Sequence, residues 1–92
     1  MQRCRGDVAA GVELHPHARE RADERGARES EVIATVERGE RFSTKFGRTG
    51  FRKNFAFNST WRGKSYRTKQ IEAFAVEEGG HWLVITVLVR YF

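Results

Sequence analysis

The segment HPHARERADERG, His15 to Gly26, carries the residues of this sequence best suited to proton transfer and phosphate binding. Proline favours the first turn of a helix and glycine its end, so the segment predicts a helix from about Pro16 to Arg25. His17, Arg21 and Arg25 then recur at four-residue steps and share one side of that helix. Imidazole exchanges protons near neutral pH, and guanidinium binds phosphate oxygens in pairs. The row therefore predicts a site for a phosphate-containing ligand.

The other charged residues of this helix fit a solvated surface. Each ion pair between them stabilises the helix by only about a few tenths of a kcal/mol, as is usual for exposed pairs on a helix. The His17 row differs because it borders Ala18 and Ala22, the small apolar stripe predicted to face the core. A single helical histidine also fits a solvated role, so catalysis and simple binding both remain open at this point.

A second group of candidates lies on the third predicted strand. Alternation places one set of side chains on the same face: Arg67, Lys69, Ile71, Ala73 and Ala75. If this face packs under the helices, its two cations meet the helical row. If Phe74 and Val76 face inward instead, both cations are merely solvated. The sequence leaves both assignments open and slightly favours the first.

The segment after the first helix predicts the remaining elements. A second helix is expected from Glu29 to Arg38, with an apolar stripe of valine and isoleucine. From Phe42 the apolar period becomes strand-like, and four strands are expected in RFSTKF, FRKNFAF, SYRTKQIEAFAV and HWLVITVLVRYF. The predicted class is α+β, with two N-terminal helices packed on one face of a curved, roughly four-stranded antiparallel sheet. Residues 13–92 form this single domain, and residues 1–12 are interpreted as a candidate mobile N-terminal arm.

Composition limits the classes of function. The 92 residues carry a net charge of +5, which favours an anionic partner such as nucleic acid. One cysteine excludes an internal disulfide framework, and with three histidines it does not supply a structural zinc set, so no metal or cofactor is expected. No apolar run is long enough for a membrane span and no signal-peptide core is present, so a cytoplasmic protein without membrane contact is expected.

Two motifs resemble a known family. HPHARERADERGARESEVIATVERGE, followed by WLVITVLVRYF, resembles the domain of unknown function 4258 over His15 to Phe92. Arg28 departs from the pattern, which more often has a Thr or Ser helix cap there. That family is similar to the barnase–EndoU–colicin–RelE (BECR) group of small metal-independent ribonuclease toxins.

The resemblance implies a RelE-like, toxin-like endoribonuclease that cleaves RNA through its 2′-hydroxyl, and that an antitoxin protein controls. The expected catalytic residues are His17 as base or acid, with Arg21 and Lys69 on the transition-state charge. The expected RNA-binding residues are Arg25, Arg67, Lys64, Tyr66 and Tyr91, the tyrosines by stacking or proton relay. Two non-enzymatic alternatives use the same basic face: a nucleic-acid-binding module and a protein-interaction domain.

Overall fold

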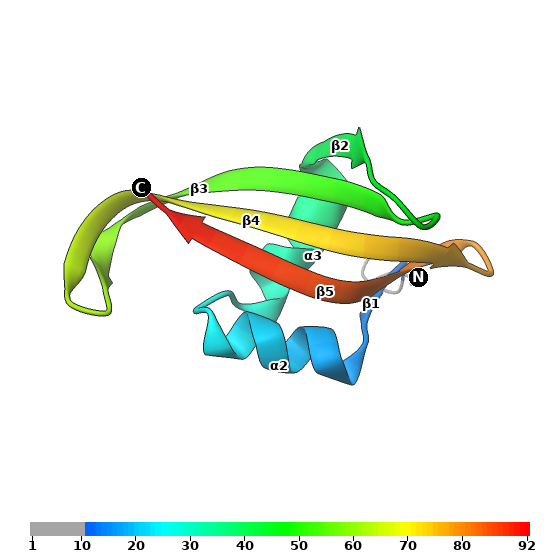
Figure 1. Cartoon of the computed structure of the whole chain (residues 1–92), viewed down its shortest axis with the longest axis horizontal. Coiled ribbons are helices and arrows are strands. Elements are labelled where there is room, and N and C mark those ends of the chain that lie inside the picture. The colour runs from blue at the N-terminus through cyan, green and yellow to red at the C-terminus, as the bar shows by residue number, and fades with distance from the viewer. Residues whose placement is uncertain (1–10) are drawn as a thin grey trace, which may run out of the picture.

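The computed structural model describes residues 11–92, which form two helices and a five-stranded mixed sheet (Figure 1). Both helices lie on one side of the sheet, as expected for the predicted α+β class. In chain order the elements are β1 (Val12–Leu14), α2 (Pro16–Glu24), α3 (Glu29–Arg38), β2 (Glu40–Ser43), β3 (Thr49–Trp61), β4 (Lys64–Glu78) and β5 (His81–Tyr91).

The sheet has one strand more than the sequence predicted. Its order is β1-β5-β4-β3-β2, and β1 pairs in parallel with β5, so the expected purely antiparallel four-stranded sheet is wrong in this detail. A three-residue strand is too short to show an alternating period, which explains why the pattern missed it. The pairing extends to Gly11, whose carbonyl accepts a 2.8 Å hydrogen bond from Trp82. The domain thus begins before residue 13, while residues 1–10 of the predicted arm lie outside the described part.

Strands β3 and β4 form a long hairpin that extends through NSTWRGK, the segment between the second and third expected strands. Pairing continues to Trp61 opposite Lys64, with a register shift between Ala56 and Ser59. The turn consists of Arg62 and Gly63, which have φ angles of 52° and 86°. Positive φ at both central residues is what a two-residue hairpin turn requires. Beyond the end of β5 the hairpin bends toward the side of the sheet that carries the helices (Figure 1).

Local signals define α2 closely. His15 Nδ1 accepts a 3.1 Å hydrogen bond from the His17 amide at the first turn, and Pro16 takes the first helical position. The helix ends at Glu24. Gly26 follows with a φ of 82°, and the Ala27 amide returns a 2.8 Å bond to the Ala22 carbonyl. The predicted helix is therefore confirmed to within one residue.

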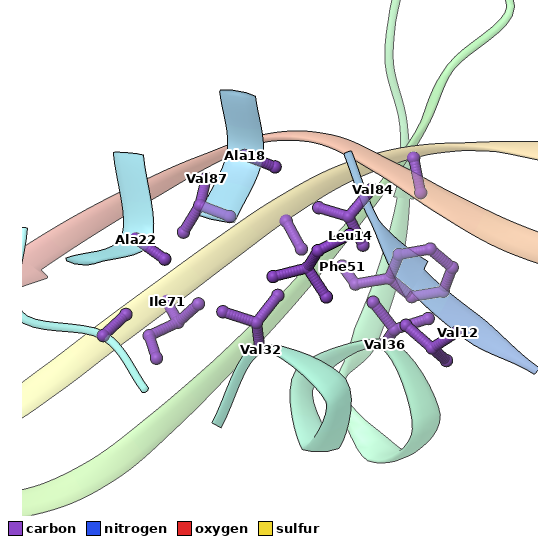
Figure 2. Packing of buried hydrophobic residues seen from close by; sticks show 13 residues of the cluster. Val12, Leu14, Ala18, Ala22, Val32, Val36, Phe51, Ile71, Val84 and Val87 are labelled. Atoms are coloured by element: carbon purple, nitrogen blue, oxygen red, sulfur yellow. The ribbon is translucent and has the colours of Figure 1, made fainter. Parts of the chain in front are cut away.

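The core lies between the sheet and the two helices (Figure 2). Ala18 and Ala22 are buried, so α2 can lie close against β5. The ambiguity over β4 is resolved, because Ile71, Ala73 and Ala75 all have 0% exposure on the face that the helices cover. Within residues 11–92, no helix lies on the opposite face of the sheet (Figure 1).

Candidate nucleic-acid interface

His17 and Arg21 form an accessible pair on α2. Arg21 Nε lies 3.3 Å from His17 Nε2 and donates to it, one helical turn away. In this hydrogen bond Nε2 is the acceptor, so its lone pair faces the Arg21 guanidinium. Arg21 also lies 4.0 Å from the Glu24 carboxylate, and its side chain keeps 41% exposure. Both groups can therefore turn toward a ligand without breaking the core.

Arg25 lies at the end of the same row but has a structural contact. Its Nη1 donates a 2.7 Å hydrogen bond to the Val87 carbonyl of β5. Beyond Val84 this side of β5 pairs with no further strand, because β1 ends there. Arg25 thus satisfies a carbonyl on that side, and only its remaining donors are available to a phosphate.

Lys69 takes the predicted face of β4 but lies in the interior. Its side chain has 7% exposure, and Nζ donates to Glu31 at 2.8 Å and to the Gly26 carbonyl at 3.0 Å. Glu31 Oε1 also accepts the Arg28 amide at 2.9 Å, so this carboxylate both caps α3 and holds Lys69. In this conformation Lys69 does not meet His17 or Arg21, and it locks the helix connection onto the sheet.

Tyr91 stands at the centre of an aromatic cluster under the bent hairpin. Its ring stacks on Trp61 with centroids 5.1 Å apart and planes at 19°, and it also meets Phe57 at 5.1 Å and Tyr66 at 5.6 Å. The phenol donates a 2.7 Å hydrogen bond to the Arg25 carbonyl. A Cβ at Gly26 would lie 2.5 Å from the Tyr91 oxygen and 2.7 Å from the Trp61 ring. Glycine is thus needed where the hairpin meets the end of α2.

The environment of Tyr91 keeps its hydroxyl protonated. Burial raises the pKa of Tyr91 above its ordinary value of 10.0; the nearby Glu31 charge raises it further, and Arg62 opposes both effects. A phenol in this state donates hydrogen bonds at neutral pH but does not act as a base.

The other predicted contacts are spread along the hairpin. Tyr66 packs beside Tyr91, and Lys64 is exposed next to the turn. Arg67 is exposed and lines a separate pocket of about 380 Å³ with residues of both hairpin strands. The structure therefore places His17 and Arg21 in contact on α2, places Arg25 directly after the helix with its guanidinium bound to β5, and brings Tyr66 together with Tyr91. It does not bring Arg67 or Lys69 to the histidine.

Comparison with known proteins yields no matching family model, no similar curated protein and no similar solved structure. The resemblance to the domain of unknown function 4258 thus remains a hypothesis based on the sequence motifs.

Two clusters were missed by the sequence reasoning. The first is a pocket of about 380 Å³ at the end of α2, lined by Glu24, Arg25, Trp61, Arg62, Val89 and Tyr91. Arg62 lies over the Trp61 ring at 5.2 Å from its centroid, and its Nη2 reaches the Glu24 carbonyl at 3.4 Å. The segment WRGK combines basic and aromatic residues, which is the sequence feature that indicates this cluster. The contact with α2 depends on the bend of the hairpin, which the sequence does not show.

The second cluster crosses three strands on the uncovered face of the sheet. Arg52 Nε donates to Glu72 at 2.9 Å, and Arg90 Nη2 lies 3.8 Å from the same carboxylate. The Glu72 side chain has only 6% exposure although neither α2 nor α3 covers it. Strand register decides this contact, since Arg52 stands directly opposite Glu72, and spacing within one segment could not have shown it.

Within residues 11–92 no three histidine, cysteine or carboxylate side chains gather in a way that could hold a metal ion. Neither helix in this part of the chain is long and apolar enough to cross a membrane.

Proposed function

We propose that this protein binds single-stranded RNA and cleaves it without a metal ion, with His17 as the general base. The observation that carries the proposal is the exposed His17–Arg21 pair, in which an imidazole nitrogen accepts a 3.3 Å hydrogen bond from a guanidinium. When a ribose hydroxyl attacks a phosphate, one group must take the hydroxyl proton and a cation must stabilise the charge on the phosphate. The His17–Arg21 pair supplies both groups.

The proposed step is an internal transfer at phosphorus. His17 Nε2 takes the proton of a ribose 2′-hydroxyl while that oxygen attacks the adjacent phosphorus, and Arg21 turns from the imidazole to the phosphate oxygens. The bond from phosphorus to O2′ forms and the bond to O5′ breaks. The electron pair of the broken bond leaves with O5′, which takes a proton from solvent. The products are a 2′,3′-cyclic phosphate and a 5′-hydroxyl end.

A cleavage assay on single-stranded RNA in the presence of EDTA tests this proposal. Wild-type protein should produce cyclic-phosphate ends, and His17→Ala should lower the rate on the order of a hundredfold or more, as loss of a general base does. His81→Ala is the matched control. His81 is a histidine at the start of β5, 3.5 Å from Glu13, and its removal should leave the rate unchanged.

Three outcomes contradict the proposal. If the wild-type protein does not cleave RNA, the proposed activity is wrong. If His17→Ala and wild type cleave at equal rates, His17 is not the general base. Loss of cleavage in Glu72→Gln with full cleavage in His17→Ala would place the active centre on the uncovered face of the sheet instead.

A second candidate is RNA binding without cleavage, which the aromatic cluster around Tyr91 favours. Stacking on aromatic rings beside cations holds single strands without any chemistry. This candidate predicts salt-sensitive binding that survives His17→Ala, with no cyclic-phosphate product. A controlling antitoxin protein remains a prediction of the sequence resemblance.

A further inference from the structure

We infer that the pocket between the end of α2 and the β3–β4 turn is a nucleobase subsite, in which Trp61 stacks an unpaired base and Arg62 binds the adjoining phosphate. This inference rests on the proposed function and defines its substrate class as RNA with an unpaired base at this position. The pocket measures about 380 Å³, near the lower end of small-molecule sites.

Trp61 is held as a rigid platform. One face of its ring is fixed by the stacked Tyr91, and Tyr91 is in turn fixed by its hydrogen bond to the Arg25 carbonyl. The Arg62 guanidinium lies 5.2 Å from the centroid of the same ring, and the ring also lines the pocket of about 380 Å³. A base can take the place of that guanidinium, because both bind an aromatic face through the same flat geometry.

Arg62 is loosely held and can follow the ligand. Within the described part of the chain its guanidinium makes one hydrogen bond, the long 3.4 Å contact to the Glu24 carbonyl, and the residue is exposed. Its φ of 52° is a conformation that asparagine or glycine adopts more easily than arginine in such a turn. An arginine in a sterically costly position, beside a stacked tryptophan, is better explained by a ligand contact than by the turn.

The subsite is continuous with the proposed reaction centre. Arg21 contacts His17 on one side and Glu24 on the other, and the Glu24 carbonyl accepts from Arg62. From His17 to Arg25 the helix rises roughly 12 Å, at about 1.5 Å per residue. A short single strand can therefore run along α2 with a phosphate at Arg21 and a base on Trp61. A rigid duplex cannot present an unpaired base to the ring.

Fluorescence of Trp61 tests the subsite directly. The chain has two tryptophans, so full-length Trp82→Phe protein keeps Trp61 as its only tryptophan reporter. The probe is a short 2′-O-methyl oligoadenylate, which lacks the reacting hydroxyl and cannot be cleaved. We expect the single strand to quench Trp61 and the same strand annealed to its complement to leave it unquenched.

Arg62→Ala in the same background should weaken binding of the single strand about tenfold, the effect of losing one stacked or ion-paired contact. Arg38→Ala is the matched control, because Arg38 is exposed in the last turn of α3 and has no ion pair within residues 11–92. It removes the same charge and should change the affinity less than twofold. Equal losses in the two variants, or equal quenching by duplex and single strand, would overturn the subsite.

The two proposals fail separately. Cleavage of natural RNA without quenching of Trp61 by the probe overturns the subsite and leaves the ribonuclease. Quenching by the single strand without any cleavage of natural RNA overturns the ribonuclease and leaves the subsite.

Discussion

Two cationic side chains near the end of α2, Lys69 and Arg21, differ in how far they are buried and in how closely their partners bind them. Lys69 has 7% exposure and gives its ammonium to Glu31 and to the Gly26 carbonyl. Arg21 keeps 41% exposure and contacts His17 at 3.3 Å and Glu24 only at 4.0 Å. The buried cation is bound by fixed partners and stabilises the fold, whereas the exposed one can exchange its partners for a ligand. A cation's partners and burial therefore decide its role more than its residue type does.

Replacing the buried cation should give the largest change in stability. Lys69→Met removes the donor of the Gly26 carbonyl and the charged partner of the Glu31 carboxylate, which keeps the Arg28 amide, so the free energy of unfolding should fall by about 3 kcal/mol. Urea unfolding followed by tryptophan fluorescence measures this. The rate of RNA cleavage per folded molecule should remain within severalfold of wild type.

Lys53→Met is the control for Lys69→Met. Lys53 lies on the neighbouring strand opposite Ile71, with its ammonium 5.3 Å from the Phe55 ring and no ion pair within residues 11–92. Its replacement should cost well under 1 kcal/mol, the usual scale of exposed charges. Equal costs for the two variants would contradict the contrast, as would a loss of cleavage in Lys69→Met without a loss of stability.

The sequence predicted most of α2, α3 and the strands that form the β2–β3 and β4–β5 hairpins because their signals are local, but not the long β3–β4 hairpin. Proline and glycine mark the ends of α2, and alternation over β4 puts Lys69 on one face with Ile71 and Ala73, which the structure shows to be the inner face. What the sequence missed depends on contacts between distant segments. Glu31 and Lys69 are 38 residues apart, and Arg62 meets Glu24 across the same separation. The spacing of residues within one segment does not predict a contact between distant segments. The sequence therefore predicts a catalytic role for Lys69, whereas in the structure its ammonium is bound by Glu31 and the Gly26 carbonyl.

The ion cluster on the uncovered face should show an intermediate effect. Glu72 is as buried as Lys69, at 6% side-chain exposure. Unlike the partners of Lys69, however, the two arginines that contact Glu72 keep another ion pair or contact with water when Glu72 is replaced. Arg52 keeps Glu40 at 3.6 Å, and Arg90 is 63% exposed to water. Glu72→Gln should therefore lower the free energy of unfolding by about 2 kcal/mol, less than Lys69→Met. Urea unfolding of both variants in one buffer ranks them, and a larger cost at Glu72 would reverse the order.

Tyr91 should give the smallest effect and a distinctive pH dependence. Its hydroxyl donates a hydrogen bond to the Arg25 carbonyl. The next carbonyl, that of Gly26, accepts from the buried Lys69, so Tyr91 lies between buried Lys69 and the exposed part of α2. Tyr91→Phe removes one hydrogen bond and should cost about 1 kcal/mol near neutral pH. Because the pKa of Tyr91 is raised in the folded state, its contribution is fully present below the ordinary value of 10.0 and is lost as pH rises through the higher folded value. The difference in unfolding free energy between wild type and Tyr91→Phe should accordingly shrink above pH 10, and a constant or growing difference would show that the phenol is not held as a protonated donor.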